Sequence, residues 1–156
     1  MTHVGAFATV LNDSGDVLVC HRRDLDLWEM PGGGVEDGET PWEAVVREVA
    51  EETGLQVAVE HLAGVYWQRR RGVLVMQFRC RPVSGRLGPS NEADEVRFVP
   101  VNNLPERMTP VVVERLRDSL EAHHEVRLVI QDGPSATEWL RTWGREPSHA
   151  PPPARP

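Results

Sequence analysis

Apolar residues along the chain follow two periods, alternation at every second position and recurrence at helical spacing, which together predict a mixture of strands and helices. Strands are predicted at residues 4–11, 16–22, 27–30, 55–59, 62–68, 73–81, 96–99 and 126–130. Helices are predicted at residues 41–53, 109–122 and 135–143. A turn cluster at residues 12–15 predicts that the first two strands form a hairpin.

The helix at residues 41–53 has the most complete boundary signals. Thr40 is placed as its N-cap, Pro41 suits the first helical position, and Glu43 completes a capping box. Gly54 is placed to end the helix in the left-handed conformation. The side expected to face the core carries Trp42, Val45, Val46, Val49 and Ala50.

The length of 156 residues suits one globular domain, predicted at residues 1–132 and followed by a short helix within residues 133–144. Residues 145–156 are proline-rich and offer little that could pack, so a disordered tail is predicted there. Two cysteines, Cys20 and Cys80, have neither disulfide nor zinc spacing and are interpreted as small buried apolar residues.

Charge and hydropathy restrict the partners. The net charge is −7, from 24 acidic residues against 17 Lys and Arg, whereas binders of nucleic acid polymers usually present a basic surface. The sequence shows no signal peptide pattern and no apolar run of membrane-spanning length. We therefore expect a cytoplasmic protein that binds neither a nucleic acid polymer nor a membrane, while a small phosphate ligand bridged by metal ions remains compatible with the charge.

Three glutamates, Glu48, Glu51 and Glu52, project from one face of the predicted helix at positions i, i+3 and i+4. Each such pair of like charges destabilises a helix by roughly 0.2–0.5 kcal/mol. A divalent cation would reverse the sign of this effect, and clustered oxygen ligands suit Mg²⁺. Taken alone, the run is also compatible with a solvated acidic face.

The residues around these glutamates extend the pattern. The fixed positions run Gly33-x5-Glu39-x7-Arg47-Glu48-Val49-x-Glu51-Glu52-x-Gly54-Leu55. This motif resembles the Nudix box at every fixed position, and the order of predicted strands around it is similar to that of a Nudix hydrolase. The resemblance implies an α/β/α sandwich, with a mixed β-sheet between helix 41–53 and helix 109–122.

Roles for individual residues follow from the resemblance. It implies that metal ligands are the carbonyl of Gly32 and the carboxylates of Glu48, Glu51 and Glu52, while Gly33 and Gly34 belong to the loop that receives the pyrophosphate. Arg47 would orient the carboxylates through a salt bridge, with Glu39 in a supporting role. Family members often take a further acidic ligand from a later loop, for which Glu92 is the first candidate here and Glu95 the second.

Cations near the predicted second strand are candidates for binding the phosphates. Arg22 and Arg23 end that strand, although a solvent-facing strand end is the alternative interpretation. Trp28 could stack on a nucleobase or pack in the core. These alternatives stay open at the level of sequence.

The predicted activity is hydrolysis of a phosphoanhydride bond with Mg²⁺, or Mn²⁺ as a substitute. Water would attack one phosphorus in line, with Glu52 or Glu48 as the base. Expected substrates are ADP-ribose-like compounds, nucleotide sugars or nucleoside triphosphates, and the family resemblance allows a homodimer. The alternatives are a catalytically silent nucleotide sensor on the same fold and an acidic interaction domain, the latter leaving residues 32–34 and Arg47 unexplained.

Overall fold

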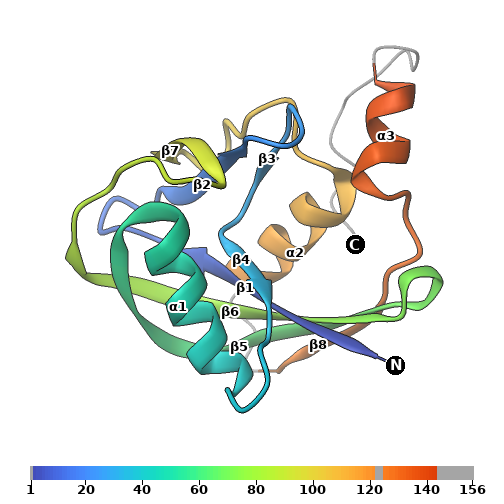
Figure 1. Ribbon diagram of the computed structural model, residues 1–156, viewed down its shortest axis with the longest axis horizontal. Helices are drawn as coiled ribbons and strands as arrows, with labels where there is room; N and C mark the ends of the chain where they lie inside the picture. The colour runs from blue at the N-terminus through green and yellow to red at the C-terminus, as the bar shows by residue number, and fades with distance from the viewer. Residues whose placement is uncertain (1, 122–124, 144–156) are drawn as a thin grey trace.

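Two β-sheets and three α-helices make up the part of the chain that the computed structural model describes, residues 2–121 and 125–143 (Figure 1). The larger sheet has the strand order β4-β1-β6-β5-β8. Its strands are β4 (Gly32–Gly34), β1 (His3–Val10), β6 (Val73–Gly85), β5 (Leu55–Gln68) and β8 (Arg127–Ile130). The sheet is mixed, because β1 pairs in parallel with β6 and β5 with β8, while β4–β1 and β5–β6 are antiparallel.

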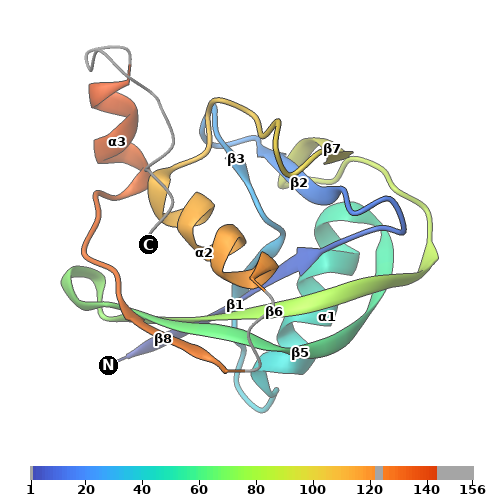
Figure 2. The same ribbon diagram turned by 180° about the vertical axis from the view of Figure 1, so that it is seen from behind.

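The sheet lies between two helices, α1 (Pro41–Thr53) and α2 (Pro110–Leu120). Alternate residues of β1 show the two faces: Ala6 and Ala8 belong to a core cluster with valines of α1, whereas the hydroxyl of Thr9 donates to Ser119 Oγ of α2 at 2.9 Å. The two views in Figure 1 and Figure 2 show the helices on opposite sides of the long β5–β6 hairpin. The predicted arrangement of helix, mixed sheet and helix is confirmed.

Helix α1 begins and ends where the sequence predicts. Both hydrogen bonds of the capping box between Thr40 and Glu43 are present, and Gly54 ends the helix with φ 82°. Ala44, Val45 and Val49 are fully buried against the sheet. Trp42, predicted on the core side, is instead 54% exposed. It has the correct helical phase but stands in the first turn, where the described part of the chain leaves it uncovered.

A second, smaller sheet has the order β3-β2-β7 and is formed by β3 (Trp28–Glu29), β2 (Val17–Arg22) and β7 (Ala93–Val99). The predicted hairpin between the first two strands is therefore wrong. β1 and β2 separate into different sheets and meet through the single bridge Leu11–Val17. The inner face of the small sheet packs with α2 in a second apolar cluster that includes Val19, Met30 and Leu116.

Several connections complete the fold. Strand β5 is continuous through the two predicted segments, with register shifts that absorb the gap between them. A 3₁₀ turn, η1 (Arg69–Arg71), joins β5 to β6, and α3 (Ala136–Thr142) follows β8. The predicted tail at residues 145–156 lies outside the described residues. Among the described helices, none combines the length and apolar character needed to cross a membrane.

Candidate active site

Three carboxylates converge on one side of the molecule, from two separate elements. Glu48 and Glu52 project from the same face of α1, one helical turn apart, and Glu92 comes from the loop before β7. One carboxylate oxygen from each lies within 4.8 Å of the others. Spacing along the helix accounts for the first two, whereas the third is brought in because β7 pairs with β2 in the neighbouring sheet.

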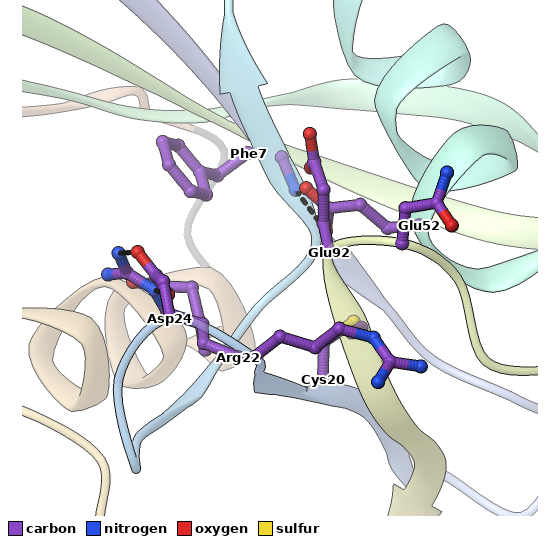
Figure 3. Close-up of a pocket in the computed structure, with 11 residues that line it drawn as sticks. Phe7, Cys20, Arg22, Asp24, Glu52 and Glu92 are labelled. Carbon is purple, nitrogen blue, oxygen red and sulfur yellow. Dashed lines mark hydrogen bonds and ion pairs between the residues drawn. The ribbon is translucent and has the colours of Figure 1, made fainter.

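A cleft of about 450 Å³ opens beside this cluster (Figure 3). It lies between the end of β2, the start of β4, α1 and the loop before β7. Its lining residues are Phe7, Cys20, Arg22, Arg23, Asp24, Glu29, Gly32, Glu52, Asn91, Glu92 and Ala93. In Figure 3, Glu52 and Glu92 meet at one end of the cleft, while Arg22 and Asp24 stand on the opposite side. The cleft thus presents an acidic end and a cationic side to a common space.

Burial and mutual repulsion act on the clustered carboxylates. Burial, followed by the nearby charge of Glu48, raises the pKa of Glu52 from 4.5 to about 8. The pKa of Glu48 is also raised, mainly by burial, although Arg47 opposes the shift. Burial and neighbouring negative charge thus disfavour the ionised forms of both carboxylates.

Arg47 connects most of the remaining acidic side chains of the motif. Its guanidinium donates to both carboxylate oxygens of Glu39, at 2.6 and 3.0 Å, and to Glu48 Oε1 at 2.9 Å. Further hydrogen bonds reach Glu51 Oε2 at 3.2 Å and the carbonyl of Gly34 at 3.1 Å. The Arg47 guanidinium lowers the pKa of Glu39 from 4.5 to about 2. Arg47, anchored by its two hydrogen bonds to Glu39, thus fixes the orientation of the Glu48 carboxylate.

The glycine run lies directly against the carboxylates. A Cβ atom on Gly33 would stand 2.5 Å from Glu48 Oε1, so only glycine allows this close approach of the β4 backbone to the helix. The N–H of Gly32 points toward Glu52 Oε2 at 3.4 Å, and Gly32 also lines the cleft. Gly34 faces Arg47 through its carbonyl. Gly33 and Gly34, predicted to receive the phosphates, are not among the residues that line the cleft.

The two predicted phosphate-binding arginines differ in their partners. Arg22 is held by Asp24 through two hydrogen bonds, at 2.8 and 2.5 Å. Arg23 donates from Nε to the carbonyl of Ser90 at 2.8 Å and forms no ion pair with a carboxylate of the described residues, although its charge helps to lower the pKa of Asp94. Both side chains line the cleft. Arg23 is therefore the less neutralised of the two cations.

Two acidic residues named by the sequence lie apart from the carboxylate cluster. The side chain of Glu51 is 56% exposed and bonds to Arg47, so it is directed away from Glu52 and Glu92. Glu95 lies on β7 next to Arg97, with 3.5 Å between Oε1 and Nη1. Of the two loop candidates, Glu92 is the one that the structure brings to the helix.

A buried ion pair at the floor of the cleft escaped the sequence reasoning. Glu29 Oε1 lies 3.4 Å from Arg115 Nη2, and the Arg115 side chain is only 3% exposed. The Arg115 guanidinium also stacks over the ring of Phe7, 4.8 Å from its centroid. The available signal was the position of Arg115, which falls within the apolar stripe of the predicted helix 109–122 where a charge is unexpected.

The donor set fits a hard divalent cation. Three carboxylate oxygens gathered within 4.8 Å, with raised pKa values at Glu48 and Glu52, form an anionic cradle that a cation would neutralise. Oxygen ligands of this kind are those that Mg²⁺ and Mn²⁺ prefer.

Comparison with known proteins decides the family. The family model described as the NUDIX domain matches residues 1–119. The chain belongs to the Nudix family. A MutT-like protein of Streptomyces ambofaciens is 40% identical over 118 residues, covering 76% of this chain and 77% of the relative. A putative 8-oxo-dGTP diphosphatase of Bacillus subtilis is 33% identical, covering 82% of this chain and 87% of the relative.

Further Nudix proteins extend the comparison. An ADP-ribose pyrophosphatase of Methanocaldococcus jannaschii is 44% identical over 103 residues, and the match spans 62% of this chain and 61% of that protein. The crystal structure of a Nudix hydrolase from Nitrosomonas europaea superposes with a TM-score of 0.72 at 25% identity, covering 85% of this chain and 80% of that one. The protein is a Nudix pyrophosphohydrolase with the α/β fold of that family.

Proposed function

We propose that this Nudix protein hydrolyses a phosphoanhydride bond in a nucleoside diphosphate linked to another group, or in a nucleoside triphosphate, with Mg²⁺ as the physiological cation and Mn²⁺ as a substitute. The observation that carries the proposal is the convergence of Glu48, Glu52 and Glu92 at the acidic end of a cleft whose other side presents arginines. A diphosphate needs both features, since its own charge must be neutralised before water can attack.

Each residue of the site has a role in this proposal. The carboxylates of Glu48, Glu52 and Glu92, with the carbonyl of Gly32, would hold the cation. When bound, it neutralises the phosphate oxygens and makes water a better nucleophile. Arg47 and Glu39 position Glu48 through the hydrogen bonds described above. Glu51, which bonds to Arg47, reaches the cation only if its exposed side chain turns toward the cleft.

The arginines of the cleft bind the phosphates of the substrate, and one glutamate accepts a proton. Arg23, which lacks a described carboxylate partner, binds a phosphate oxygen, and Arg22 assists from its pair with Asp24. Glu52 or Glu48 accepts the proton of the attacking water. Of the two, Glu52 lines the cleft directly.

The substrate class is narrowed by the family members named above. One related protein is named for 8-oxo-dGTP and another for ADP-ribose, so both compounds belong in the first assay, together with nucleotide sugars and ordinary nucleoside triphosphates. We propose hydrolysis of a nucleoside diphosphate derivative as the activity common to these substrates.

The decisive experiment measures phosphate and nucleotide release over this substrate panel with Mg²⁺, Mn²⁺ or chelator. Glu52→Gln is expected to lower turnover of the best substrate by at least about a hundredfold, because removal of one electrostatic element of a catalytic site typically costs this much. Glu60→Gln, an exposed glutamate on β5, is the matched control and should keep full activity.

The outcome separates the rival functions. Tight nucleotide binding with Mg²⁺ but no release of product would favour a nucleotide sensor. Absence of both binding and turnover would contradict the proposal altogether. Unchanged turnover in Glu52→Gln would remove that residue from the mechanism.

A further inference from the structure

A second pocket, of about 310 Å³, lies between η1 at the tip of the β5–β6 hairpin and helix α3. Figure 1 shows α3 above this hairpin tip. Three arginines line the pocket, Arg70, Arg71 and Arg141, with one carboxylate, Glu138. The pocket, here called the basic pocket, therefore has an excess of positive charge in a chain whose net charge is −7. Positive charge gathered in this way attracts anions to one place on an acidic protein.

Two elements that are distant in the sequence bring these arginines together. Arg70 and Arg71 belong to η1, and Arg141 belongs to α3. Arg70 Nη2 lies 3.5 Å from Glu138 Oε1 and so connects the hairpin tip to the helix. Arg141 follows Glu138 by three residues, which places the two side chains on the same face of α3. The third guanidinium thus comes to the same pocket.

The charges of the basic pocket are only partly compensated. The hydrogen bonds from Ser135 lower the pKa of Glu138, and the charges of Arg70 and Arg141 lower it further, so this carboxylate is ionised. Arg71 and Arg141 form no ion pair with a carboxylate of the described residues, and both line the pocket. Two guanidinium groups therefore remain able to bind an anion there.

Helix α2 connects the basic pocket to the active-site cleft. Gly133, which lines the pocket, packs against the start of α2, where an added Cβ would stand 2.7 Å from Val111 Cγ1. Arg115 follows Val111 by one helical turn, a separation of roughly 5–6 Å. Its guanidinium stacks over the ring of Phe7, which lines the cleft. One turn of α2 thus lies between the two cavities.

Arg71 acts electrostatically on the floor of the cleft as well. Burial raises the pKa of Glu29, which lines the cleft, and the charges of Arg115 and Arg71 are among those that oppose this shift. Burial lowers the pKa of Arg115, and the charge of Arg71 contributes to the decrease. The guanidinium of Arg71 is therefore close enough to influence the cleft while it lines the basic pocket.

The strand register gives the distance that a shared ligand would span. Phe7 pairs with Gln77 of β6, and β6 begins four residues earlier at Val73, two residues after Arg71. At about 3.3 Å per residue, Phe7 and the end of η1 are roughly 13 Å apart along the sheet. This distance exceeds a diphosphate group alone, whereas a nucleoside that carries phosphate at both ends can extend across it to the arginine side chains.

We propose that the basic pocket binds a second phosphate of the substrate, an ester on the ribose at the end away from the diphosphate. This inference rests on the proposed function, because it takes the diphosphate to lie at Glu48, Glu52 and Glu92. Guanidinium groups suit a phosphate ester, since their planar forks donate paired hydrogen bonds to its oxygens. The preferred substrate is then a nucleoside diphosphate derivative whose ribose is phosphorylated.

Two substrates that differ by one phosphate ester test the proposal. With Mg²⁺, kcat/KM should be at least about tenfold higher for ADP-ribose 2′-phosphate than for ADP-ribose, because charge-assisted hydrogen bonds typically contribute this much. Arg141→Gln should reduce this ratio at least about fivefold, and Arg71→Gln should do the same. Arg81→Gln removes the same charge from an exposed position of β6 and should keep the ratio of the unaltered protein.

A binding experiment tests the pocket independently of turnover. In titration calorimetry with Mg²⁺, adenosine 2′,5′-bisphosphate or adenosine 3′,5′-bisphosphate should bind at least about tenfold more tightly than AMP, and Arg141→Gln should remove most of this difference. If neither ADP-ribose compound is hydrolysed while the bisphosphates bind in this way, the basic pocket is supported and the hydrolysis of these compounds is not. The two proposals can therefore fail separately.

Three results would overturn the inference and leave the proposed hydrolysis intact. The first is equal kcat/KM for the two ADP-ribose compounds together with equal affinities for AMP and the bisphosphates. The second is an equal change of the ratio in Arg81→Gln, which would assign the effect to net charge. The third is binding of inorganic phosphate that depends on Arg141 while the bisphosphates gain nothing over AMP, which would show that the pocket takes a free anion. Circular dichroism checks the folding of each variant.

Discussion

Arg47 is the residue on which the acidic motif depends. Four carboxylates and one carbonyl surround it: Glu36, Glu39, Glu48, Glu51 and the Gly34 backbone. No ammonium could replace these contacts, because lysine presents three donors from one point whereas guanidinium presents a planar fork. Its paired hydrogen bonds to Glu39 anchor one side of the fork and leave the other free to hold Glu48.

Arg47→Lys should therefore leave the fold intact and weaken the site. Positioning residues behind a metal ligand typically contribute about 10–100-fold to metal affinity or activity, and a loss in that range is expected for both Mg²⁺ affinity and turnover. Titration calorimetry with Mg²⁺ and steady-state kinetics measure the two effects. Arg81→Lys, at an exposed position of β6, is the control, and an equal loss in that variant would contradict a specific role for Arg47.

A substitution at Gly33 tests whether the position of the Glu48 carboxylate matters for turnover. A methyl group in Gly33→Ala would stand 2.5–2.8 Å from the three carboxylate atoms of Glu48, so the carboxylate must move. A flexible side chain yields easily, and the cost should appear in turnover more than in the free energy of unfolding. Gly34→Ala is the neighbouring control, since nothing lies within 4 Å of its added Cβ. Similar kinetics of the two variants would show that the position of Glu48 is unimportant.

At the scale of elements, β2 connects two segments that border the cleft. His21, on β2, bonds through Nδ1 to Asp94 at 2.7 Å and through Nε2 to Asp26 at 2.9 Å. Those two aspartates belong to the segments that carry Asp24 and Glu92 into the cleft. The imidazole thus ties two cleft loops together, and it needs a proton on both nitrogens to do so.

This tie predicts a pH dependence of stability. The hydrogen bond to Asp26, followed by that to Asp94, raises the pKa of His21 above 6.5. A raised folded-state pKa stabilises the protein fully below pH 6.5, and this stabilisation is lost as the pH rises through the folded value. Urea unfolding should therefore show a decrease in stability over that range that is smaller in His21→Gln. An NMR titration giving His21 a pKa at or below 6.5 would contradict a stabilising role of the hydrogen bonds to Asp26 and Asp94.

The same elements show how far sequence reasoning reaches. Helix α1 was predictable to its ends because its signals are local: a capping box, a proline and a terminal glycine. The separation of β1 from β2 was not, because a turn cluster specifies a reversal of the chain and not the sheet in which each strand finds its partner. Glu48 and Glu52 follow from helical spacing, whereas the proximity of Glu92 and the burial of Glu29 against Arg115 arise from tertiary contacts.

The whole molecule combines a stable frame with a local excess of charge. Its net charge is −7, and Glu29, Glu52 and Glu92 line a single cleft. The two apolar cores, one between α1 and the large sheet and one between α2 and the small sheet, contain none of these carboxylates. The clustered carboxylates lower the stability of the fold. Removing one of them should therefore raise the stability of the protein without ligand and reduce the further stabilisation by bound nucleotide and Mg²⁺.

Glu52→Gln tests this opposition in one series of thermal denaturation curves. Without divalent cations, the variant should melt at a higher temperature than the unaltered protein, because glutamine avoids the cost of burying or protonating a carboxylate beside Glu48. With a nonhydrolysable nucleoside diphosphate compound and Mg²⁺ at about a hundred times the dissociation constant, linkage should stabilise the unaltered protein by roughly 2.7 kcal/mol. For a chain of this size that raises the melting temperature by roughly 5–10 °C.

The variant should lose most of this rise in melting temperature, while Glu60→Gln, remote from the cleft, should match the unaltered protein with and without ligand. If Glu52→Gln melts lower than the unaltered protein in the absence of cations, its carboxylate is stabilised by the protein itself. The clustered carboxylates would then have a structural role and would not form a cation-binding site. An undiminished response to Mg²⁺ in the same variant would place the cation elsewhere.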